Sequence, residues 1–200
     1  MENRDKLVSF ITNNQKRNAE NLLSDLRKES PCEGYAQARE RILLIETAKE
    51  LKRLIPDFYV DTEKLIYSLF RENISPEEIV DLFSSLVQES ARQEKKYSYS
   101  KALDFINENI LSNQLSVGGA ADFAGLSQSG LVKLFTENMG MTPGDYIGKM
   151  RAEKSMDFLK ENFPVEKTAE RVGFSSVESY IRAFKKHMGM TPGNWKKKNL

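Results

Sequence analysis

The sequence has a single cysteine, Cys32, and a single histidine, His187, among its 200 residues. One cysteine excludes an internal disulfide, and one cysteine with one histidine falls short of the ligand set of an ordinary zinc site. Most nucleophilic and metal-dependent mechanisms need more of these side chains than the chain provides. We therefore expect no metal, no cofactor and no catalytic residues, and we expect that the protein is not an enzyme.

Long hydrophobic runs are absent as well, and the longest of them, such as Ile42–Ile45, extend over only a few residues. A membrane-spanning helix needs ~20 consecutive apolar residues, and a secretory leader needs a basic segment followed by an apolar one. Neither pattern occurs. The sequence predicts a protein with no membrane partner, located in the cytoplasm and associated with the nucleoid if it binds DNA.

What the chain does have is an uneven distribution of charge behind a net charge of +1. Residues 1–96 carry 16 basic and 18 acidic side chains, whereas residues 97–200 carry 14 basic and 11 acidic ones. No acidic residue follows Glu178, but six lysines and arginines do. Such a cationic segment suits phosphate groups, and a solubilising tail is the other interpretation of this segment taken alone.

Residues 1–96 have the three- and four-residue apolar spacing of amphipathic helices. The pattern predicts helical structure over 3–28, broken near Asn13, and a second helix over 35–55 that is closed by Pro56. The side chains expected to face inward from this second helix are Ile42, Ile45, Ala48, Leu51 and Ile55.

Two more helices are expected in this half. One runs from about Asp61, whose carboxylate suits a helix N-cap, through Phe70. The other begins at Ser75, because Ser75, Pro76 and Glu78 have the spacing of a capping box with proline in the first turn. Together these elements predict a bundle of about four helices without a catalytic constellation, and we interpret it as an input or dimerisation domain.

The second half contains an internal repeat. The segment Phe135–Tyr146 (FTENMGMTPGDY) returns as Phe184–Trp195 (FKKHMGMTPGNW), with every position displaced by 49 residues. Further upstream the displacement is 48, and Gly125 returns as Gly173. The shared hexapeptide MGMTPG is too long to recur by chance, so the chain holds two copies of one structural unit.

Each copy has the sequence features of a helix-turn-helix. A small residue lets two helices pack closely, a glycine supplies the positive φ of a tight turn, and a serine caps the second helix. A threonine-proline pair then starts a further helix after a Met-Gly stop. The residues in these roles are Ala121 and Ala169, Gly125 and Gly173, Ser127 and Ser175, Thr142 and Thr191, and Pro143 and Pro192.

The second half resembles the paired helix-turn-helix domain of AraC/XylS-type transcription regulators. The resemblance covers roughly residues 97–198 and is carried by the second copy and by Arg151 upstream of it. One departure is Ser155, where the family usually has alanine. The matching segments are Ala169–Ser175 (AERVGFS), Tyr180–Lys185 (YIRAFK) and Gly189–Pro192 (GMTP).

Together with the bundle of the first half, the resemblance implies an all-α fold. We expect an N-terminal helical domain over 1–96 and a C-terminal seven-helix domain over 97–200 that contains two helix-turn-helix units. In the family, the second helix of each unit enters the major groove of DNA. The expected elements are a leading helix at about 99–110, helix-turn-helix units at about 115–139 and 164–187, and a connecting helix at about 143–161.

Motif position then identifies candidate DNA contacts. Arg182 is the strongest candidate for a guanine contact because its planar fork matches O6 and N7, and an ion pair with a nearby carboxylate is the alternative. The candidates for facing bases are Ser129, Val132, Lys133, Val177, Glu178, Ser179 and Arg182. The candidates for contacting the DNA backbone are Thr136, Lys185, Lys186, Lys196, Lys197 and Lys198.

We therefore expect a sequence-specific transcription regulator, activator or repressor, that inserts two recognition helices into successive major grooves of double-stranded DNA. RNA polymerase and a second copy, bound through residues 1–96, are candidate partners. A helical protein-interaction module with a degenerate DNA-binding repeat is the alternative. A DNA-repair methyltransferase acting through Cys32 is a third interpretation, but Cys32 has no histidine close to it in sequence.

Overall fold

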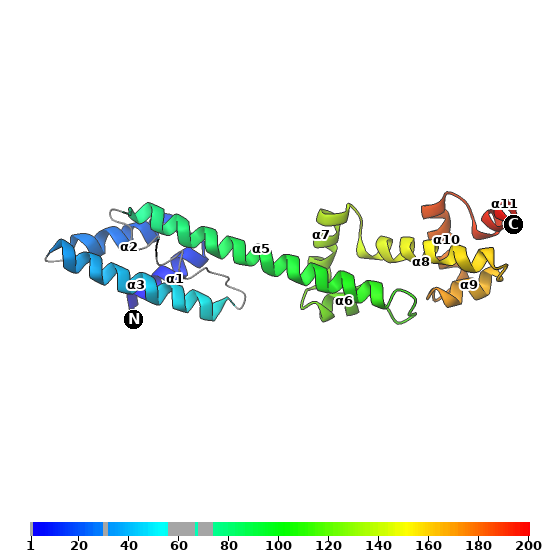
Figure 1. Cartoon of the computed structure of the whole chain (residues 1–200), viewed down its shortest axis with the longest axis horizontal. Coiled ribbons are helices and arrows are strands. Elements are labelled where there is room, and N and C mark those ends of the chain that lie inside the picture. The colour runs from blue at the N-terminus through cyan, green and yellow to red at the C-terminus, as the bar shows by residue number, and fades with distance from the viewer. Residues whose placement is uncertain (1, 30–31, 56–66, 68–73) are drawn as a thin grey trace. The chain divides into compact units, whose positions relative to one another are not determined.

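The computed structural model describes residues 2–29, 32–55, 67 and 74–200. All regular secondary structure in these residues is helical, so the all-α expectation is confirmed. The chain divides into two compact units, Met1–Glu94 and Lys95–Leu200, which run from blue to green and from green to red in Figure 1. In the described part of the chain, no helix is long and apolar enough to cross a membrane.

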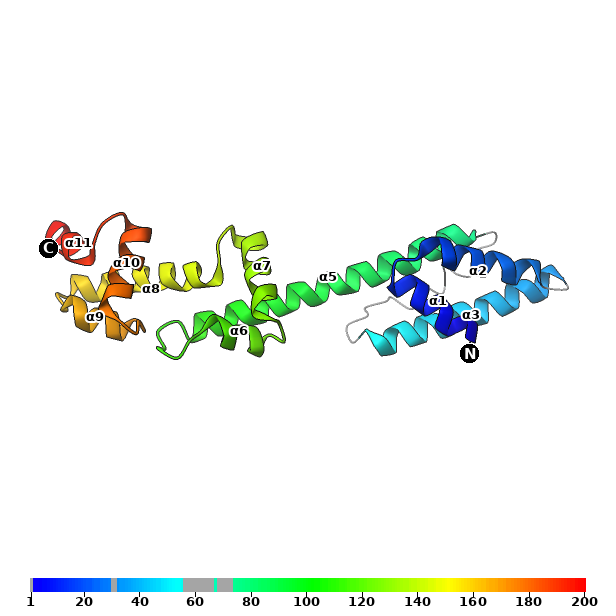
Figure 2. The ribbon, with the colours of Figure 1, turned by 180° about the vertical axis from the view of Figure 1, so that it is seen from behind.

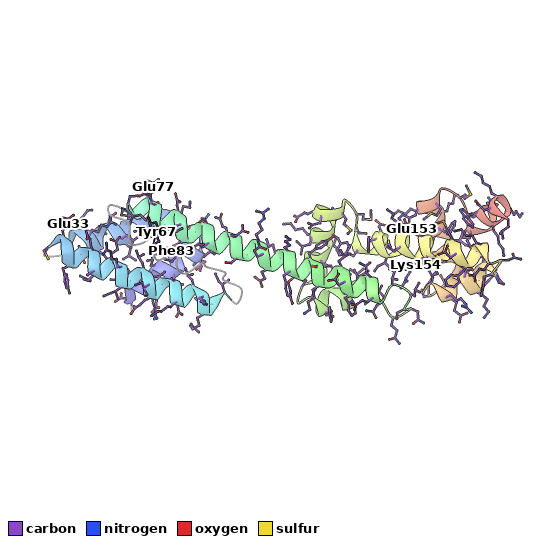
Figure 3. All side chains as sticks on the ribbon, in the orientation of Figure 1. Glu33, Tyr67, Glu77, Phe83, Glu153 and Lys154 are labelled. Atoms are coloured by element: carbon purple, nitrogen blue, oxygen red, sulfur yellow. The ribbon has the colours of Figure 1, made fainter. Side chains whose placement is uncertain are left out.

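The first unit packs its helices around a hydrophobic core that includes Leu7, Leu23, Leu44 and Phe83, the last of which is labelled in Figure 3. The expected break near Asn13 is present, and Asn14 adopts a φ of 56° there. The helix expected from about Asp61 lies outside the described residues. The helices of this unit are α1 (Glu2–Thr12), α2 (Lys16–Lys28), α3 (Glu33–Leu54) and the first part of α5 (Pro76–Glu108).

The inward face of α3 differs from the one that its apolar residues predict. Ile42 is 59% exposed, so its predicted inward position is wrong. Two polar side chains occupy the buried face instead, and each has a partner: Glu40 accepts from Arg27 Nε at 2.9 Å, and Thr47 donates to Leu43 O at 2.8 Å. The apolar pattern placed Ile42 wrongly because two polar residues share the buried face of α3 with Leu51.

The start of α5 is the predicted capping box. Ser75 Oγ accepts from the Glu78 amide at 3.1 Å, and the Glu78 carboxylate accepts from the Ser75 amide at 2.8 Å. The helix then continues to Glu108, whereas the sequence predicts a separate leading helix at about 99–110. The stretch from Gln93 to Ser100 contains no glycine or proline to end the helix, and α5 therefore supplies residues to both units.

The second unit has two small cores, one for each copy of the repeat. The first surrounds Leu131 and Phe135, and the second surrounds Tyr180 and Phe184. In Figures 1 and 2, α7 lies beside the beginning of α8, and α10 crosses α8 further along. The helices after α5 are α6 (Val117–Phe123), α7 (Gln128–Met139), α8 (Pro143–Lys160), α9 (Val165–Arg171), α10 (Val177–Met188) and α11 (Pro192–Asn199).

Candidate nucleic-acid interface

The two helix-turn-helix turns have the same backbone geometry. In the first, the Leu126 amide donates to Ala121 O at 2.9 Å, and in the second the Phe174 amide donates to Ala169 O at 3.0 Å. The glycine before each of these residues has the expected positive φ, of 70° in the first copy and 86° in the second. The two copies therefore present their second helices, α7 and α10, through equivalent turns.

The serine caps of these helices agree with the sequence pattern in only one copy. Ser127 Oγ accepts from the Gly130 amide at 3.1 Å, as predicted. In the second copy the cap is Ser176, which accepts from the Ser179 amide at 3.2 Å, so the prediction of Ser175 is wrong. The displacement between the copies changes from 48 to 49 at this point of the chain, and Ser175 is the additional residue. Extending the displacement of 49 back from Phe135 to Ser127 would have identified the correct serine.

The threonine caps that start α8 and α11 are confirmed. Thr142 accepts from the Asp145 amide at 3.2 Å, and Thr191 accepts from the Asn194 amide at 3.3 Å. Each threonine is followed by a proline in the first turn of its helix. The connections that leave α7 and α10 are thus equivalent as well.

The outward face of α7 carries the predicted residues. Leu131 and Phe135 are buried beneath it. Lys133 lies 3.9 Å from Glu137, and its side chain remains largely in solvent. Of the four residues predicted for this helix, Ser129, Lys133 and Thr136 are exposed and Val132 is half-buried.

The outward face of α10 is similar. Tyr180 and Phe184 are buried beneath it. Arg182 is exposed, and its guanidinium donates to Ser179 Oγ at 3.3 Å. Within the described residues it forms no ion pair, so the alternative of a carboxylate partner finds no support there. Of the other residues predicted for this helix, Glu178 is exposed and Val177 is half-buried, as is Ser179.

Two of the predicted DNA-backbone contacts already have partners inside the second unit. Lys186 forms an ion pair with Asp145, and this pairing lowers the pKa of the Asp145 carboxyl. Lys196 donates to Asn162 O and Phe163 O, both at 2.9 Å, just beyond the end of α8. The sequence gives no direct signal of these contacts, because the partners are 41 and 33–34 residues away.

The other three lysines that are predicted to contact the DNA backbone remain accessible to phosphate groups. Lys185, Lys197 and Lys198 are exposed. Among the described residues, none of the three takes part in an ion pair. Of the five lysines predicted to contact the DNA backbone, three are thus exposed without such partners in the described residues, and two make contacts inside the second unit. The sixth predicted residue, Thr136, donates its hydroxyl hydrogen to Val132 O at 2.8 Å.

Comparison with known proteins finds a family match in the second half of the chain. Residues 120–198 match the family model described as a helix-turn-helix domain. A probable transcriptional regulator, LumQ of Photobacterium leiognathi, is 32% identical over 82 residues, which are 40% of this chain. Those residues are 33% of the relative, so the chain spans about a third of its length.

Two solved structures are similar to the second half of the chain. The C-terminal domain of AraT, a response regulator from Geobacillus stearothermophilus, is 25% identical, with 50% of this chain and 84% of that one covered and a TM-score of 0.47. The C-terminal domain of the two-component response regulator yesN from Fusobacterium nucleatum is 28% identical, with 48% and 93% covered and a TM-score of 0.44.

Proposed function

We propose that the protein is a sequence-specific transcription regulator of the AraC type that binds double-stranded DNA, and the match of residues 120–198 to a helix-turn-helix domain supports this proposal. The observation that carries the proposal is the duplication of one exposed surface. Both α7 and α10 bury two large side chains on one face and leave polar and charged residues on the other. A recognition helix needs a free outward face, and the chain has two.

The two helices are proposed to enter successive major grooves. The connecting helix α8 has 18 residues, which corresponds to a length of about 27 Å. This length is of the same order as one turn of B-DNA, ~34 Å. Since α7 lies beside the beginning of α8 and α10 lies further along it (Figures 1 and 2), one protomer would cover an asymmetric site.

Base reading is assigned to residues on the outward faces of both helices. Arg182 would donate to guanine O6 and N7, Glu178 would accept from cytosine N4, and Lys133 would donate to guanine or to phosphate. Val132 and Val177 would contact thymine methyl groups. Lys185, Lys197 and Lys198 are the proposed phosphate contacts, because these residues are exposed and cationic side chains commonly bind DNA phosphates.

For the first half of the chain, contact with a second copy through residues 1–96 stays a prediction, as does contact with RNA polymerase. Tyr35 and Ile42 are 53% and 59% exposed and lie seven residues apart on α3, a spacing that paired helices use. Sedimentation equilibrium of the wild-type protein and of Ile42→Lys tests self-association. A wild-type chain that stays monomeric over the whole concentration range would refute it.

The proposed function is tested by selecting bound sequences from random double-stranded DNA. We expect one enriched, asymmetric site with two blocks of preferred bases. We also expect log K to fall with log salt by ~0.9 per neutralised phosphate. Equal, weak binding to selected and random DNA would favour the alternative, an interaction module with a degenerate repeat.

A further inference from the structure

Arg151 lies in the middle of α8 and is only 7% exposed. Its guanidinium forms no ion pair with a carboxylate in the described part of the chain. Nε donates to Ile110 O at 2.8 Å, and a terminal nitrogen donates to Ser112 O at 2.7 Å. Because a buried charge needs hydrogen-bond partners, the two carbonyls fix both the position and the plane of the guanidinium.

These carbonyls belong to the segment between α5 and α6, which leads into the first copy of the repeat, and the Ile110 side chain packs in the core of that copy. On its other side, Arg151 contacts the second copy, since its Cζ lies 5.5 Å from the centre of the Phe174 ring. Phe174 is the residue that fills the turn between α9 and α10. One side chain of the connecting helix therefore contacts both copies.

The same place also brings two stretches of backbone into contact. A Cβ atom added to Gly173 would lie 2.7 Å from Leu111 O and 3.1 Å from Arg151 Cζ. The equivalent glycine of the first copy, Gly125, has nothing within 4 Å of such an atom. Gly173 therefore serves two purposes, the positive φ of the turn and the close approach of the second copy to the first.

Resting on the proposed function, we propose that Arg151 and Gly173 are positioning residues that set the spacing of the two half-sites. They join the end of the leading helix to the turn that presents α10, so they fix how α10 is held relative to the first copy. One additional base pair moves a half-site by ~3.4 Å along the duplex and rotates it by ~35°. A pair of recognition helices held in this way cannot follow that change, whereas a loosely joined pair can.

The test uses the full chain and the site obtained by selection. That site is prepared with its natural spacing and with one base pair added or removed between the two blocks. Binding to the three DNA sites is measured at one salt concentration for the wild type, Arg151→Met, Gly173→Ala and Phe174→Leu. The last variant introduces leucine, which is the residue at the equivalent position, Leu126, of the first copy. The matched controls are Gly125→Ala, which meets open space, and Lys154→Met, on the same helix as Arg151 but exposed (Figure 3).

For the wild type and both controls, we expect each altered spacing to weaken binding by roughly tenfold or more, as the loss of one set of base contacts implies. For Arg151→Met and Gly173→Ala, we expect weaker binding to the natural spacing and less than about threefold dependence on spacing. For Phe174→Leu, we expect a dependence of binding on spacing that is weaker than that of the wild type and stronger than that of Arg151→Met. Reduced folding alone would lower the affinity for all three spacings by the same factor, so the spacing profile identifies positioning.

Folded Arg151 and Gly173 variants that keep the wild-type spacing profile would overturn the inference. If Arg151→Met does not unfold cooperatively, Phe174→Leu takes its place, and a wild-type profile for that variant would overturn the inference equally. A wild-type protein that selects no DNA sequence would instead refute the proposed function.

Discussion

The hydroxyl of Tyr180 donates a hydrogen bond to Ser155 Oγ across the contact between α10 and α8, with 3.0 Å between the two oxygen atoms. Ser155 in turn donates to Ala152 O at 2.6 Å. Both Tyr180 and Ser155 have no exposed surface. Ser155 thus gives a buried phenol its acceptor.

Ser155→Ala should therefore destabilise the second unit. The Tyr180 hydroxyl would stay buried without an acceptor, which costs ~1–3 kcal/mol, and the higher helix propensity of alanine would offset only ~0.5 kcal/mol of that. Urea unfolding followed by circular dichroism measures the difference. As the control, Tyr180→Phe in the Ser155→Ala background should recover most of the loss. A Ser155→Ala protein as stable as the wild type would show that the hydrogen bond contributes nothing.

Alkaline pH should act on the same pair. Burial raises the pKa of Tyr180 from 10.0 to about 12, so the fold favours the neutral phenol. This contribution to stability is complete below pH 10.0 and is lost as the pH rises to about 12. We expect the stability of the wild type to decline over this interval more steeply than that of Tyr180→Phe. Identical pH profiles for the two proteins would contradict the assignment.

Arg182→Ala should change which DNA is preferred as well as how tightly it is bound. If Arg182 reads one guanine, its loss costs ~1–3 kcal/mol at that base pair and relaxes the preference there. Lys185→Ala, three residues further along α10, should instead weaken binding to all sequences alike. Repeating the selection with each variant distinguishes the two roles. An unchanged preferred sequence for Arg182→Ala would remove Arg182 from the base-reading residues.

Lys196→Ala and Lys198→Ala should differ although the two lysines are two residues apart. Lys196 donates to two carbonyls beyond the end of α8, so its loss should lower the unfolding free energy by about 1 kcal/mol without DNA. Lys198 is exposed, and its loss should leave stability unchanged and reduce the salt slope of binding by ~0.9. Thermal unfolding and a salt titration measure both. The opposite assignment of effects would be evidence against the observed Lys196 contacts.

Ser176→Ala should destabilise α10, and Ser175→Ala should not. Ser176 Oγ accepts from the Ser179 amide, and loss of such a cap costs ~1 kcal/mol. Ser175 is exposed and is not the cap. Thermal unfolding of the two variants compares neighbouring residues with the same substitution. Equal effects of the two changes would mean that the helix begins at a different serine in solution.

The internal repeat allows the turns and helix caps of the second half to be predicted from the sequence. Positive φ at Gly125 and Gly173 follows from the tight turn, and the caps at Thr142 and Thr191 follow from the proline after each of them. These features depend on a few neighbouring residues, so they can be deduced from the sequence. Ser176 could have been deduced too, by extending the displacement of 49 from Phe135 back to Ser127.

Contacts between distant residues could not be predicted in this way. Lys186 and Lys196 have the sequence context of surface cations, and only the fold brings Asp145 and the end of α8 next to them. The exposure of Ile42 was hidden for a related reason, because the buried face of α3 includes Glu40, whose Oε2 atom accepts a hydrogen bond from Arg27 Nε. The periodicity of a sequence shows only where its apolar residues lie. Which polar residues can be buried depends on partners from other helices, such as Arg27 for Glu40.

Gly125 and Gly173 occupy the same place in two copies of one motif, but their neighbours differ. Asparagine tolerates a positive φ better than most residues, and the open space beside Gly125 would accommodate its side chain. At Gly173 any Cβ atom would meet Leu111 O at 2.7 Å. The two copies thus share the motif but not its surroundings, and the two turns should tolerate substitutions unequally. A deep mutational scan would retain asparagine at the first turn and eliminate it at the second.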